Sequence, residues 1–117
     1  MLRNFRPGKV VIVCGRTDMR QGIDGLASIV THNYDLNVFE DTLFLFCGVR
    51  TDRIKGLYWD NNGFVLLYKR LEQGSFRWPK NVSEAKELNR KQYERLLDGF
   101  DIEPRNKPVN TKDFCIT

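Results

Sequence analysis

Residues 43–79, LFLFCGVRTDRIKGLYWDNNGFVLLYKRLEQGSFRWP, contain three apolar runs separated by turn residues, and they decide the fold that the sequence predicts. The run Leu43–Cys47 is short, continuous and rich in Phe, which is typical of a buried strand. Residues 53–59 alternate as the two faces of a strand require. Residues 64–70 follow after Asp-Asn-Asn-Gly, whose residues tolerate positive φ. The stretch therefore predicts an antiparallel β-meander with a hairpin turn at residues 60–63.

The register of this hairpin decides which side chains share a face of the sheet, because residues that lie opposite each other point to the same side. For a loop of two or four residues the expected pairs are Trp59 with Phe64, Leu57 with Leu66, Lys55 with Tyr68, and Arg53 with Arg70. One face then grades from an aromatic end beside the turn to a basic end far from it. A three-residue loop with a bulge at Gly63 shifts the register by one and disperses this face.

The segments on either side of the meander predict one more strand and a helix. Residues 9–14 form a β-branched run between glycines and are expected to join the meander. Thr17 or Asp18 is expected to cap a helix with one apolar stripe. The stripe consists of Met19, Ile23, Leu26, Ala27 and Val30. The polar, acidic residues 32–41 are interpreted as the loop that leads from this helix into the meander.

A second, shorter helix is predicted near the carboxyl end of the chain. Asn89 and Gln92 form a capping box, Leu88 and Tyr93 a hydrophobic staple, and Gly99 a left-handed stop. We therefore expect an α+β fold: an antiparallel β-meander of three to five strands packed against a helix, with a short C-terminal helix. Residues 5–103 are expected to form a single domain. Residues 104–117 are expected to be a loosely ordered C-terminal tail, because they contain two prolines and little apolar surface.

Composition restricts the possible locations of the protein. The 117 residues are 41% apolar and 29% charged, as in ordinary globular proteins. No apolar run approaches the ~20 residues that span a bilayer, and the N-terminal run is too short for a secretory signal, so we expect no membrane contact and a cytoplasmic location. Cys14 and Cys47 lie in apolar runs and are expected to be reduced core residues, whereas Cys115 is expected to be exposed.

The net charge of +4 is unevenly distributed. Residues 1–20 carry five basic side chains and one acidic, residues 21–42 carry four acidic and no basic, and residues 43–80 carry seven basic and three acidic. A segregated field of this kind attracts polyanions. Cations neutralise phosphates and aromatic rings stack on unpaired bases. The candidate DNA-binding residues are Arg50, Arg53, Lys55, Lys69, Arg70 and Arg77.

The sequence contains no recognisable catalytic motif, so no enzyme is predicted. It contains neither a GxxxxGK[ST] phosphate loop nor a GxGxxG fingerprint, and its single histidine, His32, has no nucleophile motif nearby. Three cysteines without CxxC spacing do not predict a metal site. We expect no cofactor and no small-molecule substrate. The acidic residues available to a metal-dependent nuclease, a less favoured alternative, are Asp18, Asp24, Asp52 and Asp60.

Three stretches in this order resemble one known family. They are TDMRQGIDGLASIV at 17–30, RTDRIKGLYWDNNGFVLLYKRLEQGSFRWP at 50–79 and LNRKQYERLLDGFDI at 88–102. The chain is similar over residues 5–103 to the TnpB-type accessory protein of the IS-sixty-six family of bacterial insertion sequences. The resemblance implies a small protein that is encoded beside a larger transposase and is needed for movement of the element. It implies no catalytic residue.

Together these observations predict a non-catalytic accessory factor in transposition. In the favoured hypothesis it binds DNA at the ends of the insertion sequence through the candidate cations and helps the element's transposase to assemble. In the alternative hypothesis it docks on the transposase without touching DNA. An exposed aromatic patch would then make the contact, and its candidate residues are Trp59, Phe64 and Trp78.

Overall fold

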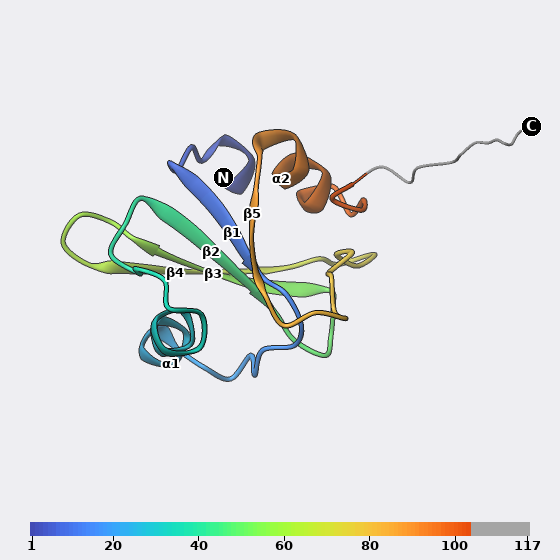
Figure 1. Cartoon of the computed structure of the whole chain (residues 1–117). Helices are drawn as coiled ribbons and strands as arrows, with labels where there is room; N and C mark the ends of the chain where they lie inside the picture. Colours follow the sequence, from blue (N-terminus) through green and yellow to red (C-terminus); the bar gives the residue numbers. More distant parts are fainter. Residues whose placement is uncertain (104–117) are drawn as a thin grey trace, which may run out of the picture.

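The computed structural model of the chain describes residues 1–103, and a five-stranded sheet forms its centre (Figure 1). The strands lie in the order β4-β3-β2-β1-β5. Their bounds are β1 Lys9–Val13, β2 Thr42–Cys47, β3 Arg53–Trp59, β4 Phe64–Arg70 and β5 Ala85–Leu88. With its two covering helices the sheet confirms the predicted α+β class. The strand β5 was not located from the sequence, because AKEL carries two charges in four residues and lacks the β-branched side chains that mark a strand.

The predicted antiparallel meander is confirmed for residues 43–70, but the sheet as a whole is not purely antiparallel. β1 and β2 run parallel, with Lys9 aligned with Thr42, whereas β2, β3 and β4 form the expected antiparallel series. β5 pairs antiparallel with the other side of β1. Residues 14–41 cross one face of the sheet and return the chain to the end of the sheet at which β1 began. β2 therefore starts beside the start of β1 and runs parallel to it.

The register of the β3–β4 hairpin is confirmed at every predicted pair. Trp59 lies opposite Phe64, and the ladder continues to Arg53 opposite Arg70. The turn is closed by a 2.7 Å hydrogen bond from the Asp60 N–H to the Gly63 carbonyl. Asn61 has a φ of +62°, a conformation that asparagine tolerates better than most residues. A four-residue loop therefore sets the register.

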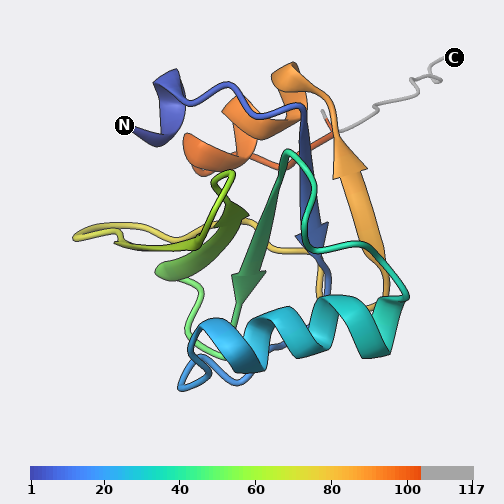
Figure 2. The ribbon, with the colours of Figure 1, turned by 90° about the vertical axis from the view of Figure 1, so that its left-hand side faces the viewer.

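Helices cover both faces of the sheet (Figure 2). On one face α1 (Ile23–Ser28) continues into a π-helical turn, η2 (Ile29–Asn33), and buries Leu26 and Val30 against β1, β2 and β3. On the other face lie α2 (Arg90–Leu97) and the short N-terminal helix η1 (Leu2–Asn4). The two faces thus bury separate apolar clusters, and the alternation of β1 and β2 supplies both.

The first helix begins later than the sequence predicted. Its N-cap is Gly22, with no side-chain cap, rather than Thr17 or Asp18. The Asp18 carboxylate instead accepts hydrogen bonds from the backbone N–H and the guanidinium of Arg20, which holds residues 18–20 in a turn. A short aspartate side chain often binds a backbone N–H two residues ahead in this way, and the bond competes with helix formation.

The second helix begins and ends as predicted. The Asn89 side chain accepts from the Gln92 N–H and the Gln92 side chain accepts from the Asn89 N–H, both at 2.8 Å. Gly99 follows the helix with a φ of +84°. The helix is joined to η1 by the buried Tyr93 hydroxyl, which donates a 2.9 Å hydrogen bond to the Leu2 carbonyl. The two ends of the described chain are therefore packed together.

Two further expectations concern the core and the tail. Cys14 and Cys47 are buried free thiols, as predicted. No helix within residues 1–103 is long and apolar enough to cross a membrane. The expected tail at 104–117, with Cys115, lies outside the described residues, so the domain boundary after residue 103 stays a prediction.

Candidate nucleic-acid interface

Three segments that are far apart in the sequence meet at one end of the sheet, where β1 and β2 both terminate. The Thr17 N–H donates to the Cys47 carbonyl at 2.8 Å, which joins residues 15–20 to the turn that follows β2. The Gly15 N–H donates to the Pro79 carbonyl at 2.8 Å, and the Phe76 N–H to the Thr51 carbonyl at 2.7 Å. These bonds hold segments 15–20, 48–53 and 76–80 side by side. Carboxyl ends of neighbouring parallel strands are a common location for binding sites.

The three segments together carry six basic side chains. We call this set the basic end, and its members are Arg16, Arg20, Arg50, Arg53, Arg77 and Lys80. The Arg53 side chain is partly buried, whereas the other members are exposed. Burial raises the pKa of the nearby Cys47 thiol, and the positive charge of Lys80 offsets a small part of this rise. The cations therefore gather where the connecting segments at this end of the sheet meet, and not on one face of the hairpin.

A cleft of about 470 Å³ opens within the basic end. It is lined by Arg16, Thr17, Asp18, Met19, Gly48, Val49, Arg50 and Arg53. The cleft depends on a close approach at Gly48, where an added Cβ would lie 2.6 Å from Met19 Cγ and 3.0 Å from the Thr17 carbonyl oxygen. Glycine at this position lets residues 17–19 pack directly on the turn after β2. Three arginines from two segments thus line one concave surface.

Two carboxylates hold some of these arginines in place. Asp52 accepts from Arg53 Nε at 2.9 Å and lies 3.5 Å from Arg50 Nη2, while Asp18 accepts from Arg20 Nη2 at 2.8 Å. The Arg20 hydrogen bonds lower the pKa of the Asp18 carboxyl to about 2, and the Arg53 hydrogen bond lowers the pKa of Asp52. Both carboxylates are therefore ionised at neutral pH. They orient their arginines while cations still outnumber anions in the three segments.

Arg16 and Lys80 differ from the other members of the basic end, because neither forms an ion pair within residues 1–103. Both side chains are exposed. They lie on adjacent backbone segments, since Gly15 is hydrogen-bonded to Pro79. Both were missing from the candidates named from the sequence. The signal that could have identified Arg16 was the excess of basic residues in 1–20.

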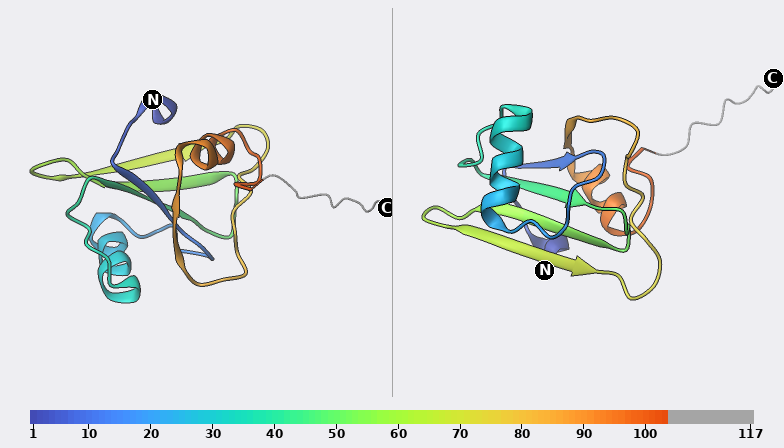
Figure 3. Two further views of the ribbon diagram at one scale, coloured as in Figure 1. Left: turned by 45° about the horizontal axis from the view of Figure 1, so that its top comes forward. Right: turned by 90° about the horizontal axis from the view of Figure 1, so that it is seen from below.

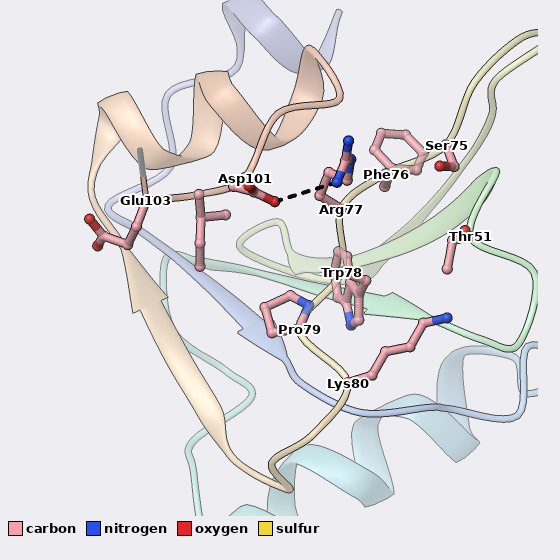
Figure 4. A pocket seen from close by; sticks show the side chains of 10 residues that line it. Thr51, Ser75, Phe76, Arg77, Trp78, Pro79, Lys80, Asp101 and Glu103 are labelled. Carbon is pink, nitrogen blue, oxygen red and sulfur yellow. Dashed lines mark ion pairs between the residues drawn. The ribbon is translucent and has the colours of Figure 1, made fainter. Parts of the chain in front are cut away.

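A second concavity, a groove of about 680 Å³, is lined by the FRWP motif (Figure 4). Arg77 lies along it with Nη1 4.0 Å from Asp101 Oδ1, and Lys80 follows Pro79 at its wall. Trp78 forms part of its wall but is only 6% exposed, and its indole N–H donates a 3.1 Å hydrogen bond to the Val13 carbonyl. Trp78 is a core residue. Its expected place in an exposed aromatic patch was therefore wrong.

Of the remaining candidate cations, Arg70 lies opposite Arg53 on one face of the hairpin, whereas Lys55 and Lys69 do not join the basic end. The ammonium of Lys55 is partly buried and donates a 2.9 Å hydrogen bond to the Gln21 carbonyl, so it anchors the segment before α1. Arg70 is exposed and pairs with Glu72 at 3.1 Å. Lys69 points to the opposite face of the sheet from Arg70, because successive residues of a strand alternate. The candidate cations Lys69 and Arg70 therefore do not share one surface.

Three aromatic rings form a small patch at the other end of the β3–β4 hairpin. Trp59 and Phe64 lie opposite each other with ring centroids 5.0 Å apart, and both are partly exposed. Phe39 packs against them, with centroids 5.0 Å from Trp59 and 5.6 Å from Phe64, and is 59% exposed. We call these three residues the aromatic patch. Phe39 was missed because it lies in the acidic stretch that was interpreted only as a loop.

The acidic residues considered for a nuclease are dispersed. Asp18 and Asp52 are paired with arginines, Asp60 lies in the hairpin turn and Asp24 lies in the first turn of α1. Within residues 1–103 no group of three or more His, Cys, Asp or Glu side chains is arranged to hold a metal ion.

Comparison with known proteins places the chain among accessory proteins of insertion sequences. The family model of IS66 Orf2 like proteins matches residues 8–107. "Uncharacterized protein y4hO" of Sinorhizobium fredii is 36% identical over 101 residues, covering 86% of this chain and 88% of the relative. "Uncharacterized protein y4jC" of the same organism is 28% identical over 110 residues, covering 93% and 94%. No solved structure matches. The chain belongs to the family of IS66 Orf2-like proteins and is thus an accessory protein associated with the transposition of an insertion sequence.

Proposed function

We propose that this protein binds DNA at the ends of its insertion sequence through the basic end and thereby helps the transposase to assemble there. One observation carries the proposal: backbone hydrogen bonds bring segments 15–20, 48–53 and 76–80 together, so that six cations meet at one end of the sheet. Family membership supplies the biological setting, since an accessory protein of transposition works beside DNA.

The chemistry of the basic end suits a phosphate backbone. Five of its six cations are arginines, whose planar guanidinium groups match phosphate oxygens in bidentate contacts. Asp52 holds Arg53 and lies near Arg50, so the entropic cost of ordering these side chains falls largely on folding rather than on binding. Arg16 and Lys80 have no competing carboxylate in the described chain, and each phosphate that they neutralise releases counterions from the DNA.

The test is a double charge reversal with a control that changes net charge equally. Arg16→Glu with Lys80→Glu alters two exposed cations of the basic end, and folding should persist because neither forms an ion pair in residues 1–103. Lys9→Glu with Lys91→Glu alters two exposed cations elsewhere, one at the start of β1 and one on α2. Fluorescence anisotropy measures the affinity for terminal element DNA and for random duplex at several salt concentrations.

We expect the Arg16 and Lys80 variant to bind DNA weakly. The slope of log affinity against log salt concentration should become less steep by about two, roughly one for each lost phosphate contact. The control should lose much less and keep its slope. Equal losses in both variants would show that only net charge matters. Absence of any salt-dependent complex with the unmodified protein would refute the proposal itself.

The aromatic patch supports a second candidate function, docking on the transposase without DNA contact. Phe39 exposes more than half of its surface while two further rings fix its position, as in the aromatic anchors of protein interfaces. Phe39→Ala should then abolish co-purification with the transposase in the presence of nuclease and high salt. Phe100→Ala, which truncates a phenylalanine of similar exposure beside α2, is the matched control.

A further inference from the structure

The strand β4 forms a free edge of the sheet, and its properties differ from those of the other edge. No strand lies beyond β4 in the described chain, and Figure 3 shows it along the border of the sheet. β4 is seven residues long, contains no proline and pairs with β3 without a bulge. β5, the opposite edge, has only four residues, two of them charged. Short and charged edges resist pairing, whereas a long regular edge offers a row of free donors and acceptors.

The hydrogen bonds at both ends of the hairpin show which groups of β4 are free. The Asp60 N–H donates to the Gly63 carbonyl at 2.7 Å, and the Leu71 N–H donates to the Asp52 carbonyl at 2.6 Å. Bonded and non-bonded pairs alternate along an antiparallel ladder, so Val65, Leu67 and Lys69 direct their N–H and carbonyl groups to β3. The outward-pointing backbone groups are those of Phe64, Leu66, Tyr68 and Arg70.

We propose that β4 pairs antiparallel with β4 of a second copy of this chain, with the two-fold axis at Leu67, to form a continuous ten-stranded sheet. Only registers that bring outward-pointing residues opposite each other can form the ladder, and this one uses all of them. On one face Phe64 meets Arg70 of the second copy and Leu66 meets Tyr68. On the other face Val65 meets Lys69, and Leu67 meets its own symmetry mate. No like charges lie directly opposite each other.

The exposed apolar surface and the charges of β4 both favour a second copy of the chain as its partner. Val65 is 38% exposed and Tyr68 54% exposed on opposite faces of the same edge strand, so pairing removes apolar surface from water on both sides. Val65 and Leu67 also line an apolar cavity of about 310 Å³ that includes Asp60. Lys69 forms no ion pair within residues 1–103. In the proposed register its stem covers the partner's cavity and its ammonium approaches the partner's Asp60.

The first test measures mass in solution. Sedimentation or light scattering across a range of concentrations should show a monomer–dimer equilibrium. Tyr68→Pro removes one outward N–H while sparing every β3–β4 bond, so it should yield a folded monomer, with far-UV circular dichroism checking the fold. Tyr68→Ala keeps the N–H and should still dimerise. Loss of the dimer in both variants would overturn pairing through the backbone, and so would a natural chain that is monomeric at all concentrations.

The second test reads the register itself and does not depend on the proline variant. In a non-hydrogen-bonded pair the Cα atoms lie about 4.5 Å apart, within the roughly 4.4–6.8 Å that a disulfide spans. Leu67→Cys in a Cys115→Ser background should therefore form an intermolecular disulfide under mild oxidation. Val65→Cys is the control, since the Cα atoms of the two copies of residue 65 would lie about 14 Å apart. Equal cross-linking of both variants, or of neither, would overturn the proposed pairing.

Discussion

Replacing Gly48 by alanine tests the packing that forms the basic end. The new Cβ would lie 2.6 Å from Met19 Cγ and 3.0 Å from the Thr17 carbonyl oxygen. The methionine side chain can rotate away, but the Thr17 backbone is held by its 2.8 Å hydrogen bond to Cys47. Overpacking of this kind costs about 1–3 kcal/mol, and loss of that hydrogen bond adds about 1 kcal/mol. We therefore expect Gly48→Ala to lower the free energy of unfolding by about 2–4 kcal/mol.

Urea unfolding followed by tryptophan fluorescence measures this change, and Gly63→Ala provides the control. No atom lies within 4 Å of a Cβ built at Gly63, and its φ lies outside the left-handed region, so alanine should change stability by less than about 1 kcal/mol. A Gly48→Ala protein as stable as the natural chain would refute the close approach of residues 17–19 to the turn. It would also remove the structural basis of the cleft.

Three further outcomes are expected. Trp78→Phe should lower the free energy of unfolding by about 1–3 kcal/mol in urea, because the Val13 carbonyl loses its indole donor. In an NMR titration Asp18 should show a pKa of about 2, and Arg20→Ala should raise this pKa towards 3.8. The ion pair between Asp18 and Arg20 contributes to stability above pH 3.8, and this contribution is lost as the pH falls towards 2. Burial raises the pKa of Cys47 from 9.0 to about 11. The buried neutral thiol therefore contributes to stability below pH 9, and this contribution is lost as the pH rises from 9 towards 11. At pH 9 the native protein should resist thiol alkylation, whereas the unfolded protein should be alkylated.

Local sequence patterns correctly predicted the parts of the fold that depend on residues close together in the chain. The turn at 60–63 and the alternation around it determined the β3–β4 register, and the capping box at Asn89 determined the start of α2. The start of α1 was wrong because Asp18 binds Arg20 rather than a helix terminus. The parallel β1–β2 pair depends on the path of residues 14–41 over the sheet, which no local pattern encodes.

The candidate site was harder to predict, because it depends on contacts between distant segments. Alternation along a strand correctly placed Arg53 and Arg70 on one face, but it also separates Lys69 from them. The gathering of cations at the end of the sheet arises from backbone bonds such as that between Gly15 and Pro79, which are 64 residues apart. The burial of Trp78 likewise follows from its bond to Val13, on a strand far away in sequence.

The parallel pair has a consequence for the order of events during synthesis. The strands β2, β3 and β4 can zip up locally as they leave the ribosome, since each pairs with its immediate successor. β1 is made first but needs β2 on one side, and on the other side it needs β5, where Val10 pairs with Leu88. Loop closure over such separations is slow. The first of the five described strands therefore remains incompletely paired until nearly the whole described polypeptide has emerged.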